Sequence, residues 1–407
     1  MTMRYVIVGG GIAGTSAAEA IRRRDPEGSI LILSDEPYPL WSKIRLPELF
    51  SGSVDAEGLV IRKMRWYERR DIDLLINVEV TGIDPEARVV RTARGGEMPY
   101  DRLLLATGGL AYVPPIPGSD GENVHTVRKL GQTLRVYERL EGLDTIVIIG
   151  GGTLGLELAR NLLDTVGEVH VVESHARLLP KLTDPSASEM LQLRLERMGI
   201  NVHHECETSK IVGDGRATEV VMEDGRGLGC DAVIVATGMR ANKALGEALG
   251  METERGIVVD DHMRTSVPHV YAAGDACEHR RVKYGTWRAA EMQGAHAGAN
   301  MAGEDLVYDG TVPSKYVRVA GADVFSAGYL DPDGELDSVL HVEWEEMVYR
   351  RLVLDDRGIV GAVMVGDVGD AQRVLRAIEE GIDVRPHMDD VRGWDLSFVS
   401  RLMKERD

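Results

Sequence analysis

Two glycine-rich segments have the residue types and the spacing to bind phosphate groups. Gly9-Gly10-Gly11-Ile12-Ala13-Gly14 follows the apolar run Tyr5–Val8, and Gly150-Gly151-Gly152-Thr153-Leu154-Gly155 follows Thr145–Ile149. In the pattern G-x-G-x-x-G, the first glycine permits a tight turn, the second lets the backbone approach a pyrophosphate, and the third lets a helix pack against a strand. The free N–H groups and the dipole at the helix N-terminus favour the anion. Two such fingerprints indicate two bound dinucleotides with electron transfer between them.

An acidic residue about 20 residues into such a unit accepts hydrogen bonds from ribose hydroxyls. Asp35 and Glu36 close the strand expected at 30–33, and Glu173 closes the strand expected at 169–172. A carboxylate there also repels the 2′-phosphate of NADP, by roughly 1–4 kcal/mol at about 4 Å. We therefore expect NADH, and the nearby His175 and Arg177 leave NADPH as the less favoured alternative.

The elements that position these residues are expected in the same succession twice. Residues 3–8, 12–24 and 29–33 predict a strand, a helix and a strand, as do 146–149, 154–163 and 168–172. A strand–helix–strand crossover is right-handed, so each succession predicts a Rossmann-like half. Two more apolar strands end in small-residue turns, where a chain can pass close to a cofactor: Ala106-Thr107-Gly108 and Ala236-Thr237-Gly238.

The pattern changes beyond about residue 308. Short β-like runs are expected at 315–319, 324–328, 348–354 and 359–365, with a last helix at about 370–380. The fold class is therefore α/β, with two Rossmann-like dinucleotide-binding domains and a small C-terminal α+β domain.

The composition excludes several classes of function. A net charge of −19 argues against nucleic acid or an anionic membrane as the main partner. The three cysteines have no metal-ligand spacing, so no metal site is expected. No apolar stretch approaches the roughly 20 residues that span a bilayer, so we expect a cytoplasmic protein.

The order of the motifs resembles that of the FAD-dependent pyridine nucleotide-disulfide oxidoreductases, whose architecture is glutathione reductase-like. Further family motifs match Thr265–Asp275 and Trp287–Gly294. The resemblance implies FAD on the first fingerprint and NAD(P)H on the second. It also implies that Asp275 lies at the ribityl chain, that the neighbouring Gly274 belongs to the cofactor site, and that the helix from Trp287 points at the flavin. The implied domains are FAD-binding at 1–115 and 240–308, NAD(H)-binding at 116–239, and an interface domain at 309–407.

The missing cysteines indicate a branch of this family. There is no C-x-x-x-x-C pair, and Ile44 stands where the NADH oxidase branch has its cysteine. Without a thiolate there is no sulfur relay, and Cys277 is expected to be structural. Segment 41–52 resembles the version found in rubredoxin and nitrite reductases, and segments 319–328 and 349–367 resemble the small domain of the nitrite-reductase type. Glu48 departs from the ferredoxin-reductase type, which has a lysine there.

The resemblance implies an FAD-dependent oxidoreductase that takes a hydride from NADH and passes electrons directly to an acceptor, with Lys43 and Glu157 near the reacting rings. The expected acceptor is a rubredoxin- or ferredoxin-like protein, or a small molecule. Arg22–Arg24, Arg280, Arg281 and Lys283 are candidates for a basic patch that attracts an acidic acceptor. The oligomeric state stays open.

Two other functions stay open. One is a type II NADH:quinone oxidoreductase that uses the C-terminal apolar stripe of Leu396, Val399, Leu402 and Met403 at a membrane. Such a stripe more often packs on its own core. The other is a flavoprotein that senses NADH without turnover.

Overall fold

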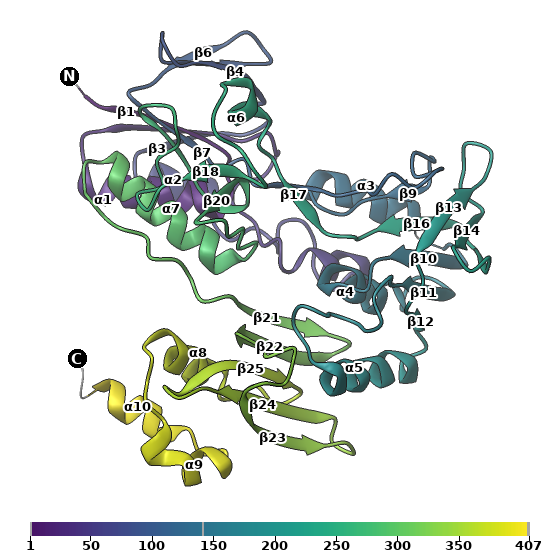
Figure 1. The fold of residues 1–407 in the computed structure, drawn as a ribbon. Helices are drawn as coiled ribbons and strands as arrows, with labels where there is room; N and C mark the ends of the chain where they lie inside the picture. Colours follow the sequence, from purple (N-terminus) through teal and green to yellow (C-terminus); the bar gives the residue numbers. More distant parts are fainter. Residues whose placement is uncertain (1, 141, 405–407) are drawn as a thin grey trace. The chain divides into compact units, whose positions relative to one another are not determined.

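The chain folds into two compact units. The structure, a computed structural model, describes residues 2–140 and 142–404. Unit 1 comprises Met1–Tyr112, Val127–Val136 and Met239–Thr311, and unit 2 comprises Val113–Thr126, Tyr137–Gly238 and Val312–Asp407. Each unit is thus assembled from segments far apart in the sequence, as the colours in Figure 1 show.

A five-stranded parallel sheet forms the centre of unit 1. Its strand order is β19-β7-β1-β2-β3. The strands are apolar along most of their length because both faces are covered, and the side chains of Ile7 and Leu104 are fully buried. The strands are β1 (Arg4–Val8), β2 (Ser29–Leu33), β3 (Ile72–Leu75), β7 (Arg102–Leu105) and β19 (Val270–Ala272).

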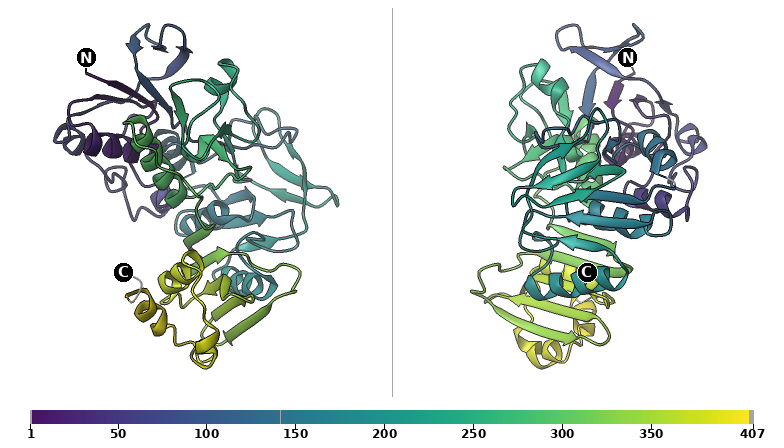
Figure 2. Two further views of the ribbon diagram at one scale, coloured as in Figure 1. Left: turned by 60° about the vertical axis from the view of Figure 1, so that its left-hand side comes forward. Right: turned by 90° about the vertical axis from the view of Figure 1, so that its right-hand side faces the viewer.

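Two helices of unit 1 pack unusually close together. Helix α1 (Ile12–Arg24) and helix α7 (Trp287–Met301) lie side by side in Figures 1 and 2. A Cβ added to Gly294 would lie 2.1 Å from the carbonyl oxygen of Ala13, and one added to Gly298 would lie 2.3 Å from that of Ala17. Glycine on α7 and alanine on α1 therefore permit the contact, which fixes the two helices against one another.

The rest of unit 1 surrounds this core. One antiparallel sheet and two strand pairs are formed by β4 (Val80–Asp84), β5 (Val89–Thr92) and β6 (Glu97–Pro99), by β8 (Gly109–Ala111) with β17 (Met239–Ala241), and by β18 (Ile257–Val259) with β20 (Cys277–His279). The short helices are η1 (Leu46–Ser51), α2 (Met64–Glu68), α6 (Ala244–Ala248) and η2 (Gly274–Ala276). Helix α3 (Leu130–Leu140) begins in this unit.

Unit 2 contains a second five-stranded parallel sheet of the same kind. Its strand order is β12-β11-β10-β16-β9. The strands are β9 (Val124–His125), β10 (Thr145–Ile149), β11 (Glu168–Val172), β12 (Asn201–His203) and β16 (Ala232–Val235), with helices α4 (Thr153–Leu162) and α5 (Pro185–Arg197). A small antiparallel sheet is formed by β13 (Thr208–Val212), β14 (Glu219–Met222) and β15 (Gly227–Gly229).

The C-terminal part of unit 2 is an antiparallel sheet with helices. The order β21-β22-β25-β24-β23 joins β21 (Ser314–Val319), β22 (Ala322–Gly328), β23 (Asp337–Glu343), β24 (Val348–Leu354) and β25 (Ile359–Val365). The helices are α8 (Ala371–Glu379), η3 (Arg385–His387), α9 (Met388–Arg392) and α10 (Ser397–Lys404). The two Rossmann-like sheets and this α+β part confirm the predicted fold class.

The C-terminal prediction left one strand unnamed and was wrong about the last helix. Strand β23 was not predicted, because it is an edge strand that leaves residues on both faces exposed and shows little alternation. The helix at 370–380 is not the last, since α9 and α10 follow it.

The apolar stripe near the C-terminus packs on the protein's own core. Leu396 and Val399 are buried in the core of the C-terminal sheet, and Leu402 and Met403 pack against it. In the part of the chain that the structure describes, no helix is both long and apolar enough to cross a membrane.

Candidate functional site

The first fingerprint forms a tight turn between β1 and α1. Gly9 has φ +118°, and a Cβ there would lie 2.1 Å from the carbonyl oxygen of Ala106. Gly14 approaches the same turn, because its Cβ would lie 2.0 Å from the Gly9 oxygen. A Cβ on Gly11, the N-cap of α1, would have nothing within 4 Å. Gly9 and Gly14 thus shape the turn, and Gly11 leaves an open cradle before Ile12 and Ala13 at the helix N-terminus.

The second fingerprint repeats this geometry in unit 2. Gly150 has φ +117°, and its Cβ would lie 2.6 Å from the Ala236 oxygen. A Cβ on Gly155 would lie 2.0 Å from the Gly150 oxygen, whereas one on Gly152 would meet nothing within 4 Å. Gly152 is the N-cap of α4, which begins at Thr153 and Leu154, and no side chain caps that end. Both cradles fit a pyrophosphate on free helix N–H groups.

Glu173 lies directly after β11 and closes the second site. Its Oε2 accepts a hydrogen bond from the Gly151 N–H at 2.8 Å, and its Oε1 accepts one from the His175 N–H at 2.8 Å. The His175 Nδ1 lies 2.7 Å from the same Oε1. Burial alone would raise the pKa of Glu173, but these hydrogen bonds outweigh it and hold the pKa below its ordinary value. The carboxylate is therefore ionised and held beside the glycine turn.

The first unit places its acids differently from the second. The Gly9 N–H donates to the Leu33 oxygen as the Gly150 N–H donates to the Val172 oxygen, both at 2.8 Å. The residue after Leu33 is Ser34, so Ser34 holds the position that Glu173 holds in unit 2.

Asp35 and Glu36 follow Ser34 and differ in exposure. Asp35 is exposed and forms an ion pair with Lys129. Glu36 is buried, accepts a hydrogen bond from the Leu130 N–H at 3.1 Å, and has its Oε1 3.5 Å from the Lys43 Nζ. Of the two acids, Glu36 is therefore the one that is buried and held by a backbone hydrogen bond.

Lys43 lies among opposite and like charges of unit 1. Burial lowers its pKa below the ordinary value, Glu36 and Asp275 oppose that shift, and Arg128 adds to it. Its ammonium group also lies 5.3 Å from the ring centre of Trp41. Lys43 thus belongs to one electrostatic cluster with the acids expected to contact a flavin nucleotide.

Asp275 is held by a basic residue that the sequence did not indicate. The Arg128 Nη2 donates to the Asp275 Oδ2 at 2.8 Å, and its Nε donates to the Gly109 oxygen at 3.0 Å. Gly274 has φ +77°, and a Cβ there would lie 3.0 Å from that of Ala13. Asp275 therefore lies close to the first fingerprint, with Arg128 across from it.

Segment 128–130 thus brings positive groups to the acids of unit 1. Arg128 faces Asp275, Lys129 faces Asp35, and the Leu130 N–H faces Glu36. Sequence reasoning missed all three groups, because they lie 94 to 147 residues from their partners. The adjacent Arg-Lys pair was the one local signal.

The other predicted residues lie at the ends of strands and helices. Thr107, after β7, donates its hydroxyl to the Asn242 oxygen at 2.6 Å, and Gly108 has φ +71°. Thr237 and Gly238 follow β16, where Gly238 has φ +106°. Trp287 begins α7, whose N-cap Thr286 accepts a hydrogen bond from Ala289.

Glu157 and Lys43 lie in different units. Glu157 is in the second turn of α4 in unit 2, partly buried, and Lys43 lies in unit 1. Each unit by itself gathers its predicted nucleotide-binding residues, and the catalytic roles of Lys43 and Glu157 stay predictions.

The cysteines differ from a redox pair. All three are free, and Cys206 and Cys230 lie in unit 2 while Cys277 lies in unit 1. Burial raises the pKa of the Cys277 thiol to about 12, which makes it a poor nucleophile. Within residues 2–140 and 142–404 there is no group of three or more His, Cys, Asp or Glu side chains that could hold a metal ion.

Comparison with known proteins agrees with this geometry. The family model described as pyridine nucleotide-disulphide oxidoreductase matches residues 3–294, and the rubredoxin NAD+ reductase C-terminal domain matches residues 313–382. The nitrite reductase [NAD(P)H] of Bacillus subtilis is 35% identical over 383 residues, which cover 94% of this chain and 48% of that protein. The chain thus spans about half the length of this relative.

Shorter reductases match over most of their own length. The NADH-rubredoxin oxidoreductase of Clostridium acetobutylicum is 27% identical, and the match covers 92% of this chain and 94% of that protein. The crystal structure of the ferredoxin reductase for the CYP199A2 system of Rhodopseudomonas palustris has a TM-score of 0.87 at 26% identity, with 97% and 98% of the two chains covered. Together with the two fingerprints, these matches show that the chain belongs to the pyridine nucleotide-disulphide oxidoreductase family.

Proposed function

We propose that the protein is an FAD-dependent NADH:acceptor oxidoreductase. In unit 1, the residues that would hold FAD are those of the first fingerprint, the acids and turns around it, and the start of α7: Gly9, Gly11, Ile12, Ala13, Gly14, Asp35, Glu36, Lys43, Ala106, Thr107, Gly108, Gly274, Asp275 and Trp287. In unit 2, those that would hold NADH are Gly150, Gly152, Thr153, Leu154, Gly155, Glu173, Thr237 and Gly238. The open cradles at Gly11 and Gly152 support both assignments.

Glu173 is the observation that carries the choice of NADH over NADPH. Its ionised carboxylate accepts ribose hydroxyl hydrogens and repels a 2′-phosphate. His175, a possible phosphate ligand, already lies 2.7 Å from Glu173. Arg177 donates to the Pro180 oxygen at 3.4 Å. The two basic residues near the turn therefore have partners within the protein.

Bound FAD would accept a hydride from NADH and release electrons singly to an acceptor. The chain's own residues bind and orient the two nucleotides and control the charge around them. The N-terminus of α7, which has no acidic residue in its first turn, would stabilise negative charge on the flavin ring. Lys43 adds a positive charge to the same cluster.

Electrons would leave this protein without a sulfur relay. Ile44 occupies the place of the branch cysteine, and Cys277 is buried with a strongly raised pKa. The names of the shorter relatives support a rubredoxin- or ferredoxin-like protein as the acceptor. We propose such a carrier, with a small molecule as the alternative acceptor.

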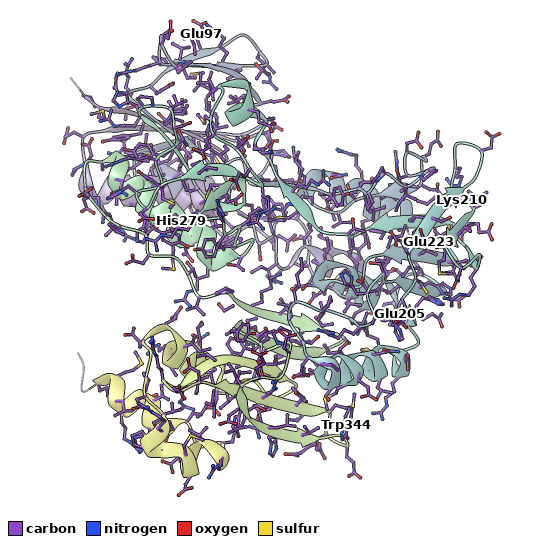
Figure 3. The ribbon with its side chains drawn as sticks, viewed as in Figure 1. Glu97, Glu205, Lys210, Glu223, His279 and Trp344 are labelled. Carbon is purple, nitrogen blue, oxygen red and sulfur yellow. The ribbon has the colours of Figure 1, made fainter. Side chains whose placement is uncertain are left out.

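Replacing Glu173 with alanine tests the assignment. Loss of a charge-assisted hydrogen bond of about 1.5–3 kcal/mol should raise the KM for NADH by roughly 10- to 150-fold. The KM for NADPH should not rise, because the repelling charge has gone. Glu223→Ala is the matched control, since Glu223 is exposed elsewhere in unit 2 (Figure 3). Unchanged NADH kinetics in Glu173→Ala contradict the assignment.

Turnover separates the proposed enzyme from a sensor. The wild-type holoenzyme should oxidise NADH continuously when menadione, an uncharged acceptor, is supplied. Flavin that NADH reduces once and that no acceptor reoxidises would contradict an oxidoreductase and favour the NADH-sensing alternative.

A further inference from the structure

Two segments of unit 1 lie side by side, with exposed apolar residues in or just beyond them. The N–H groups of Ile61 and Arg62 both donate to the Leu40 oxygen, at 2.8 and 3.2 Å. The Ser42 N–H donates to the Leu59 oxygen at 2.8 Å. Residues 40–42 and 59–62 therefore run side by side.

Three large apolar side chains, in or just beyond these segments, are exposed. Ile44 is 56% exposed, Ile61 42% and Met64 37%. We call the surface formed by Ile44, Ile61, Arg62, Met64 and Arg65 the α2 surface. Exposed apolar residues in a group are typical of a binding site.

The α2 surface is basic in an acidic protein. Residues 62–70 contain five cations and one acid, Glu68, so this stretch has a charge of +4 while the whole chain has −19. One of the five cations, Lys63, pairs with Glu57 at 3.0 Å. Arg62 and Arg70 lie over the ring of Trp66, at 5.2 and 4.1 Å from its centre. Among the described residues, the side chain of Arg65 has no ion-pair or hydrogen-bond partner. Its charge is thus available to a partner.

Several of the other basic residues that the sequence suggested have partners within the protein, and Lys283 donates to the Met239 oxygen at 3.3 Å. Arg23 pairs with Glu19, Arg24 with Glu304, and Arg280 with Asp261. Arg22 donates to the backbone oxygens of residues 25, 26, 70 and 71. These partners favour the α2 surface over Arg22–Arg24 and Arg280 as a site for an acidic carrier.

The α2 surface also borders the proposed flavin site. Ile44 directly follows Lys43, whose ammonium group lies 3.5 Å from the Glu36 carboxylate. Glu36 and Asp275 are proposed FAD contacts, and both act on Lys43 electrostatically. A protein bound at Ile44 would therefore lie close to the cofactor from which it takes electrons.

We propose that a small acidic electron-carrier protein docks on the α2 surface, an inference that rests on the proposed function. The positive charges would steer the carrier and speed its encounter. The exposed Ile44, Ile61 and Met64 would be buried in the contact and supply the short-range attraction. Such a contact suits a carrier that must bind, accept an electron and leave.

The double variant Arg62→Glu/Arg65→Glu tests this in the holoenzyme. With NADH and an acidic rubredoxin at low ionic strength, we expect kcat/KM for rubredoxin to fall at least tenfold, mainly through KM. The fall with added salt that the wild type shows should largely disappear. NADH:menadione turnover should not change, because menadione carries no charge.

The matched control reverses two exposed cations of unit 2. Lys210→Glu/Arg216→Glu makes the same change in net charge on β13 and the following turn (Figure 3). It should leave the rubredoxin kinetics as in the wild type. A second variant, Ile61→Ser/Met64→Ser, should raise the KM for rubredoxin without altering the salt dependence.

Several outcomes would overturn the proposal. One is wild-type rubredoxin kinetics in Arg62→Glu/Arg65→Glu. Another is a wild type that reduces menadione and a basic c-type cytochrome but neither rubredoxin nor an acidic [2Fe–2S] ferredoxin. A third is a wild-type protein that is a dimer and that becomes a monomer in Arg62→Glu/Arg65→Glu, because the α2 surface would then bind a second copy of the chain. A wild type that reduces none of these acceptors fails the proposed function itself, which separates the two failures.

Discussion

Tyr349 donates its hydroxyl hydrogen to the Asp184 Oδ2, which joins strand β24 of the C-terminal sheet to the start of helix α5. The other oxygen of Asp184 accepts from the Ala187 N–H at 3.0 Å and caps the helix. Arg351 lies 3.5 Å from Asp184 and 3.4 Å from the buried Asp331. Burial and the neighbouring Asp184 both raise the pKa of Tyr349, which therefore stays a neutral donor. This network holds the C-terminal sheet on the proposed NADH-binding part of unit 2.

Tyr349→Phe should destabilise unit 2 by about 1–2 kcal/mol, because it leaves the mostly buried Asp184 carboxylate with one donor fewer. Urea unfolding of the wild type and the variant measures the difference. Tyr316→Phe is the control, since Tyr316 is 51% exposed. An equal loss of unfolding free energy in both variants would contradict a specific role for the Tyr349 hydroxyl.

Gly152→Ala should separate folding from nucleotide binding. Gly152 has φ −81° and open space around its Cβ position, so alanine fits without strain. The added methyl group would occupy the cradle proposed for the NADH pyrophosphate. We expect an unchanged melting temperature, an unchanged flavin content and at least a tenfold higher KM for NADH.

Gly150→Ala is the contrasting variant. Gly150 has φ +117°, and its Cβ would lie 2.6 Å from the Ala236 oxygen, so backbone must shift. This change should destabilise the fold by several kcal/mol, by the combined cost of strain and overpacking. Equal destabilisation of the fold by Gly152→Ala and Gly150→Ala would contradict the open space around the Cβ position of Gly152.

Features encoded within a few residues were predictable from the sequence. The glycine spacing gives both turns, and helix α1 spans Ile12–Arg24, the range that its apolar pattern predicts. The spacing differs between the two units, because Asp35 and Glu36 stand one and two residues after Ser34 in unit 1, whereas an acid directly follows the strand in unit 2. The second carboxylate, Glu173, matches the expected position.

Features made by long-range pairing were not predictable. Arg128 meets Asp275 across 147 residues, and nothing near either residue indicates the other. The same holds for the network of Tyr349 and Asp184, 165 residues apart. Such pairs follow from how the sheets and loops are assembled, which local patterns do not contain.

Arg128→Met should weaken flavin binding. Asp275 would lose a charge-assisted hydrogen bond that orients its carboxylate, and the proposed FAD contact would be less well fixed. A loss of about 1.5–3 kcal/mol corresponds to a roughly 10- to 150-fold higher Kd for FAD. The flavin-to-protein absorbance ratio after gel filtration measures this. Arg135→Met, an exposed change in the same segment, is the control and should retain its flavin.

The Arg4–Asp101 pair gives unit 1 a pH-dependent stability. The hydrogen bond from Arg4 lowers the pKa of Asp101 to about 2. A carboxyl group with a depressed folded-state pKa stabilises the fold above its unfolded pKa of about 3.9, and the effect is lost as the pH falls toward 2. Because the pair is partly exposed and screened, its contribution at neutral pH is about 1 kcal/mol.

Asp101→Asn measures that contribution. The gap in unfolding free energy between wild type and variant should be constant from pH 7 to about pH 5 and shrink by about half at pH 3. Urea titrations at each pH give the gap. Asp71→Asn is the control, because the Asp71 carboxylate is 97% exposed and lies 3.6 Å from Arg22. A gap for Asp101→Asn that stays constant down to pH 3 would mean that Arg4 does not lower this pKa, and the pair would then act through its hydrogen bonds alone.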